Sequence, residues 1–177
     1  AGEDPSDERQ QFQEAADRAY EPCREHFARQ AELRKENQER REALIERLTV
    51  FAAEQAGEHP NWRAINQAIV ESRREWRQYA PVDQAIVKPL QARFHALVDE
   101  LQARLDAEYE RNVQAKRDLI ARAAELLNLE DTRKAIDEAK NLQRTWKSVG
   151  IVPWNLDSAL WDEFRQRCDA VFERSSQ

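Results

Sequence analysis

The chain has 177 residues, of which 35% are charged and 41% hydrophobic, and it contains only three glycines and six prolines. This balance is typical of long helices with solvated faces and argues against a collapsed α/β domain. The net charge of −6 argues against a generally basic nucleic-acid binder, although an acidic chain can still carry a local basic stripe. No apolar run approaches the roughly 20 residues that a membrane span requires, so we expect no membrane partner.

The first predicted helix carries one apolar stripe. Its residues are spaced by 4, 3, 4 and 4 positions, which places them on one face: Phe12, Ala16, Ala19, Cys23 and Phe27. Pro22 lies inside this stripe and should kink the helix or divide it in two. The run 23–56 contains no glycine or proline, and its dense charges over 34–47 predict a solvated helix. Gly57 and Pro60 then predict its end.

Two short helices with the same pattern follow, at about 61–78 and 132–148. Asn61 and Asp131 precede them as predicted N-caps, because their side-chain oxygens can accept from unpaired backbone amides. Each helix ends in a tryptophan, Trp76 or Trp146, and a compact connector comes next. We expect Gly150, in the second connector, to adopt the left-handed conformation that often ends a helix.

A second helix is predicted after each connector, starting near Pro89 and near Ala159. The first of these continues without a breaker to about Leu127. A leucine and a phenylalanine stand 14 and 18 residues after each tryptophan, which indicates one packing arrangement used twice. The predicted core residues are therefore Trp76, Trp146, Phe94, Phe164, Leu90 and Leu160.

These matches define a tandem repeat with an offset of 70 residues, and a third alignment extends it backwards. Asn37 matches Asn112 at an offset of 75, inside an apolar stripe where a buried asparagine usually fixes helix register through a hydrogen bond. We interpret 1–60 as the long-helix part of a first repeat, 61–130 as a complete second repeat and 131–177 as the front of a third. The predicted fold is all-α: an elongated tandem-repeat bundle of long antiparallel helices with coiled-coil-like packing.

The residues around the second tryptophan carry a resemblance to a known family. The segment Trp146 to Pro153, the helix that begins Leu160-Trp161-Asp162-Glu163-Phe164, and Phe172 resemble the bacterial tandem-repeat family called domain of unknown function 349. The first copy departs from the pattern, with Ala80, Gln91 and Asp83 in place of Gly150, Trp161 and Pro153. The resemblance implies a helical-repeat fold in a bacterial cytoplasmic protein, here as a fragment of a longer chain. It supplies no activity and no catalytic residue.

Basic residues recur between the copies on what should be one face of each short helix. The pairs are Arg63 with Arg133, Arg74 with Arg144, and Arg77 with Lys147. At 100° per residue the members of each trio lie within about 60° of one another, opposite the core stripe. Such a stripe could contact RNA, but a solvated face paired with neighbouring acids is the more ordinary interpretation. Asp17, Asp99 and Asp169 also recur and could hold the neighbouring basic helix or the amides of its connector.

Enzymatic chemistry has the least support. The three histidines and two cysteines have no metal-ligand spacing, and three glycines cannot build a phosphate loop, so we expect no metal and no cofactor. Cys23 and Cys168 are expected to be core residues in a reducing cytosol. The predicted function is a non-enzymatic scaffold that binds a protein partner or neighbouring repeats. The alternatives are RNA binding and a coiled-coil-like dimer built from 23–56 and 90–127.

Overall fold

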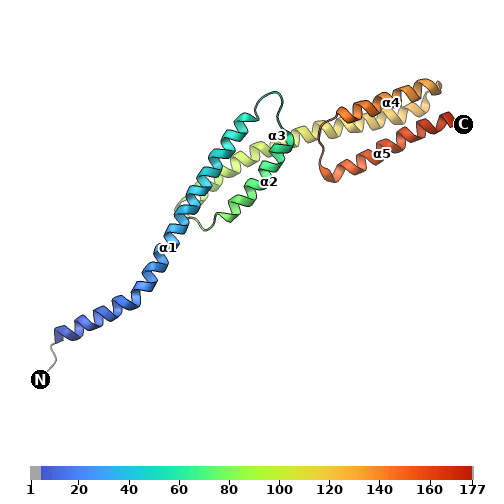
Figure 1. Cartoon of the computed structure of the whole chain (residues 1–177). Helices are drawn as coiled ribbons and strands as arrows, with labels where there is room; N and C mark the ends of the chain where they lie inside the picture. The colour runs from blue at the N-terminus through green and yellow to red at the C-terminus, as the bar shows by residue number, and fades with distance from the viewer. Residues whose placement is uncertain (1–4, 177) are drawn as a thin grey trace. The chain divides into compact units, whose positions relative to one another are not determined.

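The computed structural model describes residues 5–176, and within this range all regular structure is helical. Figure 1 shows the helices in chain order. They are α1 (Pro5–Glu54), α2 (Trp62–Gln78), α3 (Gln84–Glu125), α4 (Thr132–Ser148) and α5 (Trp154–Glu173), with 3-10 turns at Leu126–Asn128 and Arg174–Ser176. The predicted all-α fold is confirmed.

The chain divides into two compact units between Asp99 and Glu100. Unit 1 contains α1, α2 and the start of α3, and in it α2 runs back along the C-terminal half of α1 (Figure 1). Unit 2 contains the remainder of α3 together with α4 and α5, and there α4 packs directly against α5. The repeat boundaries at 60 and 130 stay a prediction.

The short helices begin and end where the sequence predicts. Asn61 Oδ1 accepts a hydrogen bond from the Ala64 amide at 3.1 Å, and Asp131 Oδ1 accepts from the Lys134 amide at the same distance. Each oxygen satisfies an amide of the first turn that has no partner inside the helix. Both predicted N-caps are confirmed.

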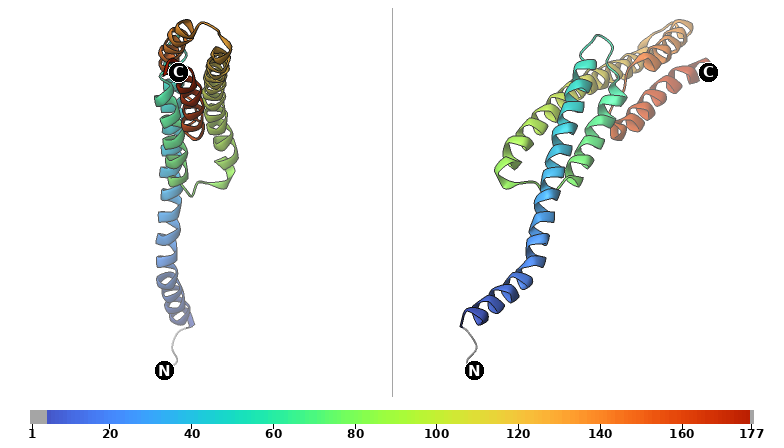
Figure 2. Two further views of the ribbon diagram at one scale, coloured as in Figure 1. Left: turned by 90° about the vertical axis from the view of Figure 1, so that its right-hand side faces the viewer. Right: turned by 60° about the vertical axis from the view of Figure 1, so that its left-hand side comes forward.

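The long helices begin elsewhere than predicted. α3 starts at Gln84, before Pro89, because Asp83 Oδ1 accepts from the Ala85 amide at 3.1 Å and caps the helix there. α5 starts at Trp154, directly after Pro153, and not near Ala159. α1 runs through Pro22 without ending, and it bends in its N-terminal part (Figure 2).

The core of each unit lies around its tryptophan. Trp76, Phe94 and Leu90 are buried in unit 1, and Trp146, Phe164 and Leu160 are buried in unit 2. Around Trp146 the core gathers residues from three helices, including Leu119 and Ala123 of α3, Ala135 and Ala139 of α4, and Cys168 and Val171 of α5. All six residues expected in the core are therefore buried.

The N-terminal half of α1 differs from every other helical segment. Residues 5–29 are all exposed, including Phe12 at 77% and Phe27 at 65% of their surface. The apolar stripe from Phe12 to Phe27 therefore faces no core in the described chain, and the expected burial of Cys23 is wrong, whereas Cys168 is buried as predicted. Within residues 5–176 no segment covers this stripe.

Candidate functional site

Each unit holds its tryptophan in a three-part arrangement, which we call the tryptophan stack. In unit 1 the Trp76 and Phe94 rings stack with centroids 4.2 Å apart and an interplanar angle of 4°. The Arg41 guanidinium lies over the Trp76 ring, 4.4 Å from its centroid. It occupies the face of the indole that Phe94 leaves open, since a stacked ring fills the other. Three helices therefore meet at one indole.

Unit 2 repeats the stack with one change of residue. The rings of Trp146 and Phe164 are 4.3 Å apart at an angle of 7°, and Lys116 Nζ lies 4.7 Å from the Trp146 centroid. Aromatic pairs and cation–π contacts each contribute roughly 0.5–1.5 kcal/mol beyond the burial of area. The repetition of the geometry indicates that the stack positions the short helix.

The two recurring asparagines attach the connectors to the long helices. Asn37 Nδ2 donates to the Pro81 carbonyl at 2.9 Å, and Asn112 Nδ2 donates to the Ile151 carbonyl at 2.7 Å. Both asparagines are buried, so the predicted buried hydrogen bond is confirmed. Its acceptor is the connector that follows the tryptophan, and each bond fixes the register between a connector and its long helix.

Gly150 has a different role from the one predicted. Neither Gly57 nor Gly150 has a positive φ, so the predicted left-handed conformation is wrong. A Cβ atom on Gly150 would lie 2.8 Å from Asn112 Nδ2 and 3.3 Å from Glu108 Oε1. Because the asparagine amide approaches the connector closely, an alanine at position 150 would force the Asn112 side chain to shift.

The buried cations are the residues that sequence reasoning missed. Arg41 and Lys116 are only 6% and 7% exposed, although Arg41 lies in the charged stretch that was expected to be solvated. Arg41 Nη2 donates to the Trp76 carbonyl at 3.1 Å, and burial lowers the pKa of its guanidinium. Lys116 Nζ lies 3.3 Å from Asp157 Oδ1. Each cation lies one helical turn after the buried asparagine of its helix, Asn37 or Asn112, and therefore on the same apolar stripe. This position in the sequence is the signal that could have predicted their burial.

Comparison with known proteins agrees with this duplicated arrangement. The family model described as Domain of Unknown Function (DUF349) matches residues 9–85 and 87–155. The chain belongs to the DUF349 family. Each matched segment of this DUF349 protein contains one of the two buried asparagines, one buried cation and the tryptophan of one stack, while the stacked phenylalanine comes from the sequence that follows the segment. No curated protein and no solved structure is significantly similar to the chain.

The six predicted basic positions are all exposed. Arg63, Arg74 and Arg77 lie on α2 in unit 1, and Arg133, Arg144 and Lys147 lie on α4 in unit 2. None of the salt bridges among residues 5–176 involves them, and the Arg144 guanidinium donates to the Asn141 side chain. Their use as a binding surface stays a prediction.

The recurring acids do not hold these helices. Asp99 and Asp169 are exposed, and within the described residues neither forms a salt bridge, so the suggestion that they hold the basic helix is wrong. In unit 1 the salt bridge between the long helix α1 and the basic helix α2 is formed by Arg47 and Glu75, whose charged atoms are 2.8 Å apart.

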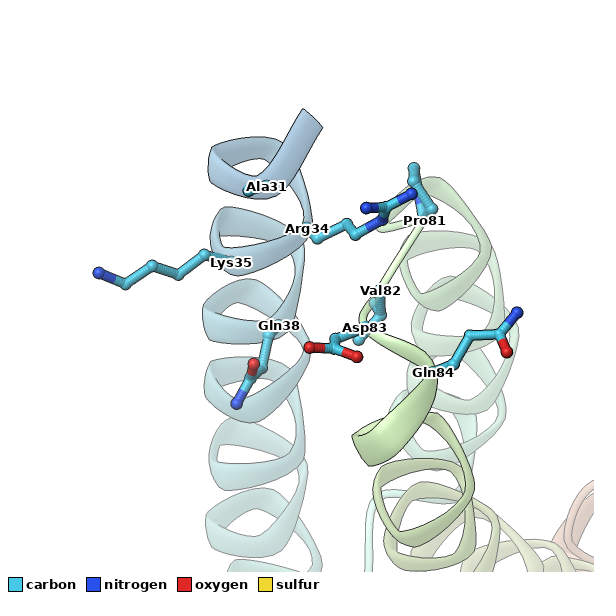
Figure 3. A pocket seen from close by; sticks show the side chains of 8 residues that line it. All are labelled: Ala31, Arg34, Lys35, Gln38, Pro81, Val82, Asp83 and Gln84. Carbon is cyan, nitrogen blue, oxygen red and sulfur yellow. The ribbon is translucent and has the colours of Figure 1, made fainter. Parts of the chain in front are cut away.

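A hollow of about 620 Å³ lies in unit 1 between α1 and the connector into α3 (Figure 3). Arg34 reaches toward Pro81 at its rim, Asp83 faces Gln38, and Lys35 points away. At four polar positions of this lining the repeat offsets place an apolar or aromatic residue in unit 2: Tyr109 for Arg34, Val113 for Gln38, Pro153 for Asp83 and Trp154 for Gln84. The acids Asp106 and Glu110 correspond to Ala31 and Lys35. The two units thus present different chemistry at corresponding places.

Trp154 and Trp161, both in α5, differ in how far they are exposed. Trp154 is 89% exposed, and Trp161 is 41% exposed with its ring 5.9 Å from that of Trp146. Trp161 thus closes one edge of the stack, whereas Trp154 stands free of the core. Among the described residues no group of histidine, cysteine and carboxylate side chains could hold a metal, and no helix could cross a membrane.

Proposed function

We propose that this DUF349 chain is a non-enzymatic helical-repeat scaffold that binds proteins. The observation that supports the proposal most is the exposure of large aromatic side chains on helices: Phe12 at 77%, Phe27 at 65% and Trp154 at 89%. A contiguous exposed stripe of apolar side chains, such as the one that contains Phe12 and Phe27, often marks a surface that a partner buries. Aromatic residues are also the usual anchors of protein interfaces.

The internal use of the recurring residues supports the same function. Within each unit, the buried asparagine binds the connector and the buried cation lies over the tryptophan ring. These residues stabilise the interior of each unit and leave its outer faces free to vary. Repeat proteins commonly build binding surfaces in this way, from a constant interior and a variable exterior. The change from Arg34 and Gln84 to Tyr109 and Trp154 is a variation of this kind.

Site-specific photo-crosslinking in cells of the source organism tests the proposal. A photoreactive phenylalanine replaces Phe12, Phe27 or Trp154 in the full chain, and the exposed polar residues Gln11 and Asn155 serve as matched control positions. We expect discrete protein adducts at the three aromatic positions and few at the controls. Equal crosslinking at the controls, or adducts that contain only nucleic acid, would reject the scaffold function.

RNA binding is the second candidate, and the exposure of six basic residues that form no salt bridge within residues 5–176 favours it: Arg63, Arg74, Arg77, Arg133, Arg144 and Lys147. With six phosphate contacts the logarithm of the affinity should fall with that of the salt concentration at a slope of about −4. Fluorescence anisotropy of labelled mixed-sequence RNA measures this slope, and replacing all six residues with glutamine should abolish binding. No binding at low salt removes this candidate.

The proposal also includes a bacterial cytoplasmic location and no cofactor. The recurring carboxylates stand singly, which supplies no acid–base pair, and two distant cysteines fit a reducing compartment. A coiled-coil-like dimer through the long helices α1 and α3 is the remaining alternative. A monomeric mass by light scattering at high protein concentration excludes it.

A further inference from the structure

We propose that the exposed stripe of α1 at Phe12, Ala16 and Ala19 is the docking site of a short amphipathic helix that ends in tryptophan, with the indole stacked on Phe12. The inference rests on the proposed protein-binding function and specifies the chemistry of one partner.

Three windows of the chain carry the same pattern: 12–20, 94–102 and 164–172. Each begins with phenylalanine and has an aspartate at its sixth position. In the second and third windows the first, fifth and eighth residues are at most 2% exposed: Phe94, Val98 and Leu101, and Phe164, Cys168 and Val171. The corresponding residues of the first window, Phe12, Ala16 and Ala19, are all exposed. The same stripe is therefore covered twice and open once.

The two covered windows identify the occupant. Phe94 and Phe164 are each stacked by an indole, at 4.2 and 4.3 Å. In both cases the tryptophan lies near the end of a helix of 17 residues, with buried residues 11, 7 and 4 positions before it. These are Ile65, Ile69 and Ser72 before Trp76, and Ala135, Ala139 and Leu142 before Trp146. A partner helix with this spacing could pack on Phe12 in the way that α2 packs on Phe94 and α4 packs on Phe164.

Side-chain size and charge refine the partner. Ala16 and Ala19 are smaller than the residues that match them in the covered windows, so the incoming helix can carry larger apolar residues at its buried positions. Residues 5–21 contain five acids and two bases. Arg77 and Lys147 follow directly after Trp76 and Trp146, and a base at this position on the partner would complement the acidic stripe.

A grafted chain tests the docking site. A second copy of residues 100–152 is placed directly ahead of Ala1, so the original chain stays intact. In this grafted chain the number of residues from the copied Trp146 to Phe12 equals the number from the original Trp146 to Phe164. Hydrogen exchange of residues 8–20 is then compared between the grafted and the original chain. If the copied helix docks on Phe12, the amides of 8–20 should exchange at least tenfold more slowly in the graft.

Two variants of the graft decide whether the protection comes from the stripe. Phe12→Ser should return the exchange of 8–20 to the rate of the original chain, while Gln11→Ser, on the neighbouring exposed position, should keep it slow. Unchanged exchange in the graft, or protection that survives Phe12→Ser, overturns the proposal. The crosslinking at Phe27 and Trp154 is independent of this result, so the docking chemistry can fail while the scaffold function stands.

Discussion

At the residue scale, Gly150 leaves room for the asparagine that attaches the connector to the long helix in unit 2. A Cβ atom on Gly150 would lie 2.8 Å from Asn112 Nδ2, the atom that donates to the Ile151 carbonyl. Gly57 has no neighbouring atom within 4 Å of the corresponding point. Because neither glycine has a positive φ, the two positions differ in packing and not in backbone conformation.

This difference predicts opposite effects for the same substitution. Gly150→Ala should lower the free energy of unfolding by about 1–3 kcal/mol, because it disturbs a buried hydrogen bond. Gly57→Ala should leave it unchanged or raise it by up to about 1 kcal/mol, because alanine restricts the unfolded chain. Urea unfolding followed by circular dichroism measures both. A loss at Gly57 as large as that at Gly150 would contradict the packing explanation.

The two cysteines predict a second residue-scale contrast. Cys23 is exposed, whereas Cys168 is buried and burial, together with Asp169, raises its pKa to about 11. Since the thiolate is the reactive form, a thiol reagent should modify Cys23 quickly and Cys168 only when the protein unfolds. Mass spectrometry after a short treatment at neutral pH reads both sites. Equal rates would show that α5 opens readily.

The raised pKa of Cys168 also predicts a pH dependence of stability. Between 9.0, the ordinary pKa of the thiol, and about 11, the folded state keeps a proton that the unfolded state has lost. The free energy of unfolding should therefore fall as the pH rises through this window, and Cys168 should contribute no pH dependence below it. Unfolding curves of the chain and of Cys168→Ala, measured across the window, test this. Identical slopes would contradict the buried thiol.

At the scale of elements, the two halves of α1 should differ in stability. Residues 5–29 are exposed throughout, whereas Leu44, Ile45 and Leu48 are buried in the core of unit 1. A helix without packing on any face is marginal in water, so its amides should exchange fast. Hydrogen exchange should be at least 100-fold slower around Leu44 to Leu48 than around residues 8–27 (on the order of 3 kcal/mol). Uniform protection along α1 would contradict this contrast.

The short helices were predictable because local chemistry decides where they begin. Asn61 and Asp131 cap them, and an apolar residue every three or four positions marks the buried face. The start of α3 was not predictable from Pro89, because Asp83 provides an earlier cap, and Pro89 is tolerated inside the helix. A sequence pattern indicates several possible starts, and the actual start of α3 is at the residue whose side chain caps a free amide.

The interior of the tryptophan stack was predictable only in part. The pairs Trp76 with Phe94 and Trp146 with Phe164 follow from the repeat spacing. Arg41 and Lys116 did not follow from it, because a charged residue in a charged stretch is normally solvated. The burial of Arg41 depends on the indole and the carbonyl of Trp76, which α2 supplies, and the burial of Lys116 depends on an indole from α4 and a carboxylate from α5. Contacts of this kind exist only after the helices have packed.

At the scale of the whole molecule, the same stack occurs once in each unit of a DUF349 protein. Each instance joins three helices through one indole, and each connector is fixed to a long helix by an asparagine. The residues outside this interior differ between the units, with the exposed Arg34 and Gln84 in one and the half-buried Tyr109 and the exposed Trp154 in the other. A constant interior with a variable exterior is what a binding scaffold requires.

The central claim is that each unit is stabilised by its own tryptophan stack, and the free energy of unfolding of three tryptophan variants tests it. Trp76→Ala and Trp146→Ala should each lower it by about 3–5 kcal/mol, since each removes a buried aromatic and leaves a cation without its ring. Trp154→Ala, at an exposed position, should change it by less than about 0.5 kcal/mol. A loss below about 1 kcal/mol at either Trp76 or Trp146 would contradict the claim.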